Sequence, residues 1–159
     1  MLFRSPMRRP LPALAAVVAA ALLAAGCGSS GPSATETYKT AFSPINSEVI
    51  GTGTAVGQAV TSASTKTNAR IGVDFARLSD RAAALAGQLV RLKPPEDVAA
   101  DHKLLVRALR KEAGSLNRIA EAAVQGDVAA AKRASTAAVT GAAGIRDPRR
   151  RIATKLKLG

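Results

Sequence analysis

The stretch that begins at Ile71 reads IGVDFARLSDRAAALAGQLVRL and ends at Leu92. Its apolar residues recur at spacings of four and three, which is the pattern of an amphipathic helix with one buried face. The residues on this face are Ile71, Phe75, Leu78, Ala82, Leu85, Leu89 and Leu92. Because Pro94 and Pro95 follow directly, the sequence predicts that the helix stops at Lys93.

The same periodicity extends to the N-terminal side of this stretch and predicts a first helix there. Its apolar or small residues are Tyr38, Phe42, Ile45, Val49, Thr52, Val56, Ala59 and Ala63. Pro44 lies within this pattern and predicts either a kink or a late start of the helix. A polar cluster over residues 62–68 separates the two patterns, and Thr65, Thr67 and Asn68 are candidate N-caps within it.

Two further helices are predicted on the C-terminal side. Glu96 and Asp97 favour the positive end of a new helix, whose buried face carries Val98, Leu105, Leu109, Leu116, Ile119 and Ala123. Gly126 is expected to end that helix, and Asp127 to cap the next. The last pattern, interrupted at Gly144 and Pro148, consists of Val128, Ala131, Ala138, Ala142, Ile145, Ile152 and Leu156.

Four amphipathic segments of similar length with short connections predict an all-α fold, an antiparallel up-down four-helix bundle. The alternative is a three-helix bundle with a loose C-terminal tail. The core is expected to be thin, because aromatic residues make up 3% of the chain and Trp is absent. Such a core needs helices that approach closely, and we expect the glycines at 51, 53, 141 and 144 to mark these contacts.

The N-terminal region has the organisation of an export signal. Arg4, Arg8 and Arg9 precede an apolar segment over residues 11–25, and small residues lead to Cys27, the only cysteine in the chain. The apolar segment is about fifteen residues long, which is short for a transmembrane helix of ~20 residues. Cleavage before Cys27 is therefore the favoured interpretation, and an ordinary secretory signal with an incidental cysteine is the alternative.

The residues Ala24-Ala25-Gly26-Cys27 resemble the lipobox of bacterial lipoproteins, although Ala24 stands where Leu is commonest. This resemblance implies that residues 1–26 are removed and that Cys27 carries a diacylglycerol, with fatty acids such as palmitate. It also implies export to the extracytoplasmic face of the cell membrane. On this interpretation residues 27–33 are the lipidated cysteine and a flexible linker, and residues 34–159 are the bundle domain with a basic C-terminal segment.

The residues that begin, end and connect the helices are similar to those of small Ala-rich lipoproteins of high-GC bacteria. The similar features are Pro94-Pro95 before the third helix, the spacing of His102, Leu105 and Leu109, and the turn at Gly126-Asp127. The resemblance covers most of the mature chain. It implies a helical domain but no particular activity, since the functions of those proteins are largely unassigned.

No catalytic, cofactor or metal motif stands out in the sequence, and we expect a non-enzymatic protein without a cofactor or metal. A di-iron bundle needs Glu three residues before His, and Ala99 occupies that position before His102. His102 is expected to be a partly buried imidazole, hydrogen-bonded at one end of the bundle. Glu48, Asp74 and Glu112 come to a similar height in an antiparallel bundle, either as a cation site or, more in keeping with their charge, as solvated flanking residues.

The charge of the chain is concentrated at its C-terminus. The net charge is +12, and the densest basic segment contains Arg146, Arg149, Arg150, Arg151, Lys155 and Lys157, opposed by Asp147 alone. In an up-down bundle this segment returns to the end nearest the lipid, together with Arg91 and Lys93. Anionic lipid or anionic wall polymer is the expected partner. Nucleic acid is not, because the protein is expected to be exported and lacks aromatic stacking residues.

These features predict a lipid-anchored, non-catalytic binding or adaptor protein of the cell envelope. It would be held at an anionic membrane or wall surface, where another envelope protein is a further expected partner. The alternative is a carrier that binds a small apolar ligand between its helices. Cavity volume discriminates between the two, because a carrier needs about 300 Å³ or more.

Overall fold

The computed structural model describes residues 31–158, so the predictions about the signal segment and Cys27 lie outside the described residues. The described residues contain four long α-helices, a short 3-10 helix (η1) and no strand. Their bounds are α1 Ala34–Ser62, η1 Ala63–Thr65, α2 Asn68–Val90, α3 Glu96–Gln125 and α4 Val128–Lys155. The all-α prediction is confirmed.

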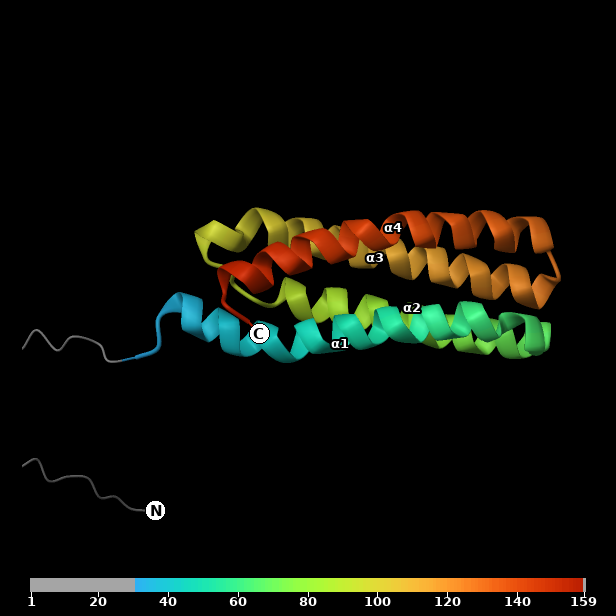
Figure 1. Ribbon diagram of the computed structural model, residues 1–159, viewed down its shortest axis with the longest axis horizontal. Helices are drawn as coiled ribbons and strands as arrows, with labels where there is room; N and C mark the ends of the chain where they lie inside the picture. The colour runs from blue at the N-terminus through green and yellow to red at the C-terminus, as the bar shows by residue number, and fades with distance from the viewer. Residues whose placement is uncertain (1–30, 159) are drawn as a thin grey trace, which may run out of the picture. The chain divides into compact units, whose positions relative to one another are not determined.

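The four helices run antiparallel in chain order (Figure 1). The start of α1, the connection from α2 to α3 and the end of α4 lie at one end of the bundle, called the basic end below. Because α4 packs along the length of α3, the chain is a four-helix bundle, and the alternative of three helices with a loose tail is wrong. The basic C-terminal segment, Arg91 and Lys93 therefore lie toward the same end of the bundle, as expected; that this end faces the lipid stays a prediction.

Local capping explains where the helices begin and end. Thr67 caps α2 by accepting a hydrogen bond from the backbone N–H of Arg70, and Asp127 caps α4 in the same way. Gly126 ends α3 with a φ of 70°, a left-handed conformation that glycine adopts without a steric penalty. The prediction that α2 stops at Lys93 is wrong by three residues, because the backbone already leaves the helix in a turn before the two prolines.

Both internal prolines are accommodated within helices. Pro44 lies inside α1, which begins at Ala34 with Ser33 as its N-cap, so of the two predicted alternatives, a kink or a late start, the late start is wrong. Pro148 lies inside α4 and is buried. A proline removes one backbone donor from a helix, and packing over the rest of α1 and α4 stabilises both helices in spite of that loss.

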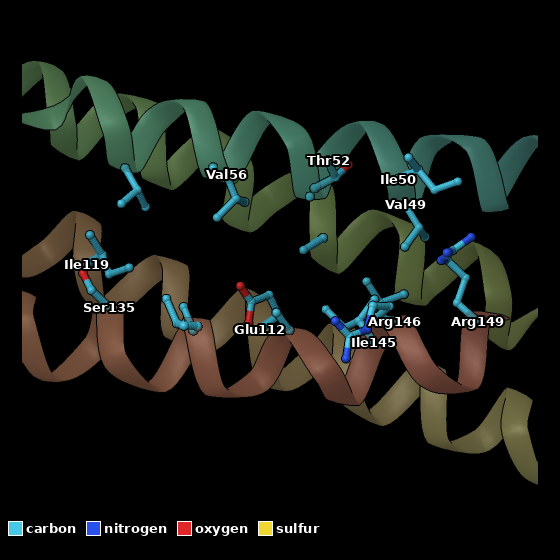
Figure 2. A pocket seen from close by; sticks show the side chains of 18 of the residues that line it. Val49, Ile50, Thr52, Val56, Glu112, Ile119, Ser135, Ile145, Arg146 and Arg149 are labelled. Carbon is cyan, nitrogen blue, oxygen red and sulfur yellow. The ribbon is translucent and has the colours of Figure 1, made fainter. Parts of the chain in front are cut away.

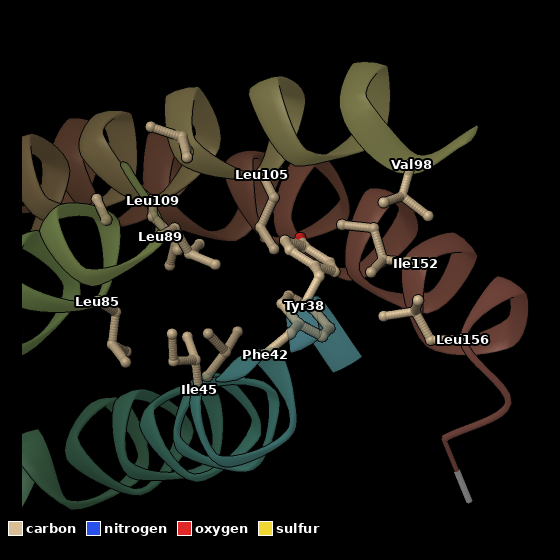
Figure 3. Packing of buried hydrophobic residues seen from close by; sticks show 13 residues of the cluster. Tyr38, Phe42, Ile45, Leu85, Leu89, Val98, Leu105, Leu109, Ile152 and Leu156 are labelled. Carbon is tan, nitrogen blue, oxygen red and sulfur yellow. The ribbon is translucent and has the colours of Figure 1, made fainter. Parts of the chain in front are cut away.

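The core divides into two clusters along the bundle. The first, at the basic end, joins all four helices (Figure 3); its members include Tyr38, Phe42, Leu85, Leu89, Leu105 and Ile152. The second surrounds Phe75 and contains mainly α2, α3 and α4 residues. The predicted face of residues 71–92 points into these clusters throughout. On α4 the prediction is wrong at Val128, which is 79% exposed, and at Ala142, also exposed.

The inner face of the first helix is less deeply buried in its second half than in its first. Its predicted face is buried from Tyr38 to Thr52, whereas Val56 and Ala59 are only partly buried. Over its length α1 packs against α2 and makes few contacts with α4. The space between α1 and α4 is where the candidate site lies.

Candidate functional site: a cleft between α1 and α4

A cleft with a volume of about 610 Å³ separates α1 from α4. Its walls are mainly apolar, with α3 forming the floor (Figure 2). The lining includes Val49, Val56, Leu109, Ile119, Ala138 and Ile145. Three of its larger side chains face solvent, because Ile50, Val60 and Val139 are 49%, 46% and 71% exposed. The cleft is therefore an open apolar groove between helices.

Glycines on α1 contribute to the width of the cleft. Gly53 and Gly57 line it, and a Cβ atom added at either position would meet no atom within 4 Å. The expectation that the glycine at 53 marks a close helix contact is therefore wrong. The glycines of α4 do lie at contacts: a Cβ at Gly141 would lie 3.1 Å from Oε2 of Glu112, and one at Gly144 would lie 3.7 Å from a side chain of α3.

Glu112 is the acidic residue of the cleft. Its side chain projects from α3 between the apolar walls (Figure 2), and the residue is only 8% exposed. Its Oε2 atom has no hydrogen-bond partner among the residues described. Burial raises the pKa of Glu112 from 4.5 to about 7, because a low-dielectric environment disfavours the charged form. The expectation that this residue is a solvated flanking charge is wrong.

The predicted meeting of three carboxylates does not occur. Asp74 accepts a hydrogen bond from Nζ of Lys66 at 2.9 Å and pairs with Arg70 at 3.2 Å, while Glu48 is exposed. The hydrogen bond from Lys66 holds the pKa of Asp74 below its ordinary value. Within residues 31–158 no three His, Cys, Asp or Glu side chains are grouped as metal ligands would be.

Asp101 ties part of the basic segment to the bundle. Nε of Arg151 donates to Oδ1 of Asp101 at 2.8 Å, and Nζ of Lys155 donates to Oδ2 at 3.3 Å. Asp101 is 7% exposed, and this burial raises its pKa. The hydrogen bonds from the two basic residues outweigh burial and hold the pKa of Asp101 below its ordinary value.

The remaining basic residues fall into two groups. Arg149 donates from Nη1 to Oδ1 of Asn46 on α1 at 2.9 Å, and Arg146 pairs with Asp147 at 3.2 Å. Both arginines also line one end of the cleft. Arg150 and Lys157 are exposed. Most of the predicted anionic-surface residues therefore hold polar partners within the protein, and the predicted contact with lipid or wall polymer stays a prediction.

His102 has the structural role that was expected. Its Nδ1 atom lies 2.8 Å from the hydroxyl oxygen of Tyr38, and the residue is 5% exposed. Burial lowers the pKa of the imidazole, although a backbone hydrogen bond involving Leu89 works in the opposite direction. The pair joins α1 to α3 at the basic end.

No helix within residues 31–158 is long and apolar enough to cross a membrane. Comparison with known proteins adds no relative: no protein-family model, no curated protein and no solved structure matches this chain.

Proposed function

We propose that the protein is a non-catalytic, lipid-anchored carrier that holds a small apolar ligand in the cleft between α1 and α4. The observation that carries this proposal is the cleft volume of about 610 Å³. Small-molecule sites occupy roughly 300–1,000 Å³ and have mainly apolar walls with a few polar groups. Uniformly tight packing of the alanine-rich helices would leave no such space.

The walls of the cleft supply the second line of support. Ile50 and Val139 are large apolar side chains that remain about half or more exposed at its rim. A ligand lying between them would remove their surface from water, which stabilises a complex by about 25 cal/mol for each Å² of apolar surface buried. Apolar ligand chemistry follows from this arrangement.

The anchor and the cellular location belong to the same proposal. They rest on the resemblance of residues 24–27 to a lipobox, which implies a diacylglycerol on Cys27 and a bundle outside the cytoplasm. The internal ion pairs of Arg151 and Lys155 support a mainly structural use of the basic segment. For this reason the carrier is favoured over an adaptor held at an anionic surface.

A fluorescent-dye assay tests the carrier. Both core clusters and every described contact between helices lie within residues 31–158, so a soluble chain that begins at Gly31 retains the whole bundle. The dye is N-phenylnaphthylamine, a neutral apolar molecule that brightens when it leaves water. We expect saturable binding by the wild-type bundle and weaker binding by Gly53→Leu, whose side chain would enter the cleft.

A control substitution at a second glycine distinguishes filling of the cleft from a general effect of replacing glycine with leucine. Gly87 also lies within a helix, and a Cβ there would meet nothing within 4 Å, but this residue does not line the cleft. Gly87→Leu should bind the dye like the wild type. Equal binding by the Gly53 and Gly87 variants, or no saturable binding by the wild type, contradicts the proposal.

A further inference from the structure

The polar groups along the cleft differ in whether the protein itself satisfies them. Thr52 donates to the backbone carbonyl of Glu48 at 2.8 Å, and Thr61 donates to that of Gly57 at 3.0 Å. Oε2 of Glu112 has no partner among the described residues. A buried carboxyl that is not hydrogen-bonded destabilises the folded chain, and an ionised one does so more strongly. Glu112 therefore needs a donor that the described bundle does not provide.

The two arginines at the end of the cleft do not fill this need. Arg146 pairs with Asp147, and Arg149 donates to Asn46, so their guanidinium groups are directed to other partners. None of the ion pairs in the described part of the chain involves Glu112. Beside Glu112 the uncompensated charge is negative and favours a cationic ligand group there. The charge of Arg149, whose partner Asn46 is neutral, lies at one end of the cleft.

The absence of a side chain at Gly141 lets the carboxyl of Glu112 lie close to α4. A Cβ atom at Gly141 would approach Oε2 of Glu112 to 3.1 Å, closer than the ordinary contact distance of a side-chain carbon atom. Glu112 also lies between Ile119 on one side and Ile145 on the other (Figure 2). From Val49 to Val60 the α1 wall rises ~16 Å at 1.5 Å per residue. The apolar walls of the cleft thus extend along its length on both sides of Glu112, the one acidic residue among the described residues that line it.

We propose that Glu112 binds the ammonium group of an amphipathic amine whose apolar part lies along the cleft. This inference rests on the proposed carrier function and names its ligand class. The ammonium group donates hydrogen bonds to the carboxylate and compensates its charge, while the aliphatic part covers the exposed apolar rim. Such charge-assisted hydrogen bonds are stronger than those between neutral groups.

Three probes of equal chain length test the headgroup preference by displacing N-phenylnaphthylamine from the wild-type bundle. They are octylamine, octanol and octanoate. We expect octylamine to bind about tenfold or more tightly than octanol, since a hydrogen bond to a charged group is worth more than one between neutral groups. Octanoate should bind most weakly, because its carboxylate would approach Glu112.

Two variants assign the preference to Glu112. Glu112→Gln keeps the shape of the side chain but removes its charge, and should reduce the octylamine affinity about tenfold without changing that of octanol. Gly141→Ala presses a methyl group against the carboxyl and should selectively weaken octylamine binding. The matched control is Glu121→Gln, which changes an exposed acid on the same helix outside the cleft and should leave all three affinities unchanged.

A pH series adds a readout that packing alone would not produce. Apart from Glu112, the charged groups lining the cleft in the described part of the chain are Arg146 and Arg149. Lowering the pH from about 8 to about 5.5 protonates Glu112 and should weaken octylamine binding by about tenfold. Octanol binding should stay constant over that range.

The possible outcomes distinguish failure of the amine inference from failure of the proposed carrier function. If the dye binds but octylamine and octanol displace it equally, or if Glu112→Gln leaves the ranking unchanged, the amine inference is overturned and the carrier stands. If octanoate binds most tightly, the amine inference is also overturned, and the carboxylate would then be bound by Arg146 and Arg149 at the end of the cleft. Absence of binding by the dye and by all three probes overturns both proposals. Because the probe ranking is measured on the wild-type bundle, it decides the inference even if a variant does not fold.

Discussion

The buried acid predicts an unusual dependence of stability on pH. In the folded protein the pKa of Glu112 is about 7, against an ordinary value of 4.5. Between these two pH values the folded state holds a proton that the unfolded state has released, so the free energy of unfolding decreases as the pH rises. The contribution is complete below about pH 4.5 and is lost once the pH passes about 7.

The size of the effect follows from the same two pKa values. At 1.36 kcal/mol per pH unit, their separation sets an upper limit of about 3 kcal/mol. Because the cleft is open to water along its rim, screening reduces this limit, and we expect about 1.5 kcal/mol. That is a measurable share of the stability of a domain held by about 5–15 kcal/mol.

Urea unfolding followed by circular dichroism at several pH values, for wild type and Glu112→Gln, measures the effect. The quantity of interest is the difference in unfolding free energy between the two proteins, because other titrating groups then cancel. His102 is one such group: its lowered pKa makes the folded state lose stability as the pH falls below about 6.5, opposite to Glu112. If the difference between the two proteins is the same at about pH 4.5 and about pH 8, the reasoning about Glu112 is refuted.

Three further predictions concern the core, the anchor and the basic segment. Phe75→Ala should lower stability by about 3–5 kcal/mol, because it empties the second core cluster, while exposed Arg81→Ala should change it by less than about 0.5 kcal/mol; equal thermal melts would contradict this core. Cys27→Ser should abolish incorporation of radioactive fatty acid in cells, and equal labelling of both proteins would end the lipoprotein interpretation. If the exposed residues Arg150 and Lys157 contact anionic lipid, replacing both with Gln should reduce salt-sensitive sedimentation with anionic vesicles; unchanged sedimentation would argue against the contact.

The order of the helices and the positions of their ends were predictable because the causes of both are local. Gly126 and Asp127 act on backbone groups within a few residues of themselves, so the sequence alone locates these helix ends. For the start of α2 the sequence left Thr65, Thr67 and Asn68 as candidates, of which the structure selects Thr67. The buried face of residues 71–92 was predictable for a related reason. A helix with one regular apolar stripe has only one way to face a core.

The cleft was harder to foresee because it depends on the distance between helices that are far apart in sequence. Gly53 is compatible with either close packing or open space, and only the path of α1 beyond Thr52 decides between them. For Glu112 a usable signal existed. It falls four residues before Leu116 and three after Leu109 on the buried face of its helix, where an acid is unlikely to reach water.

The polar contacts at the basic end have a consequence for the motion of α1. Tyr38 and Asn46 fasten its first half to α3 and α4, whereas beyond Gly53 it rests mainly on α2 through partly buried residues such as Ala55 and Ala59. Amide hydrogens of this second half should therefore exchange with solvent through small local openings, at rates well above those of the first half. A ligand in the cleft would slow exchange in that segment alone. The exchange rates of the second half of α1 would therefore show whether the cleft is occupied.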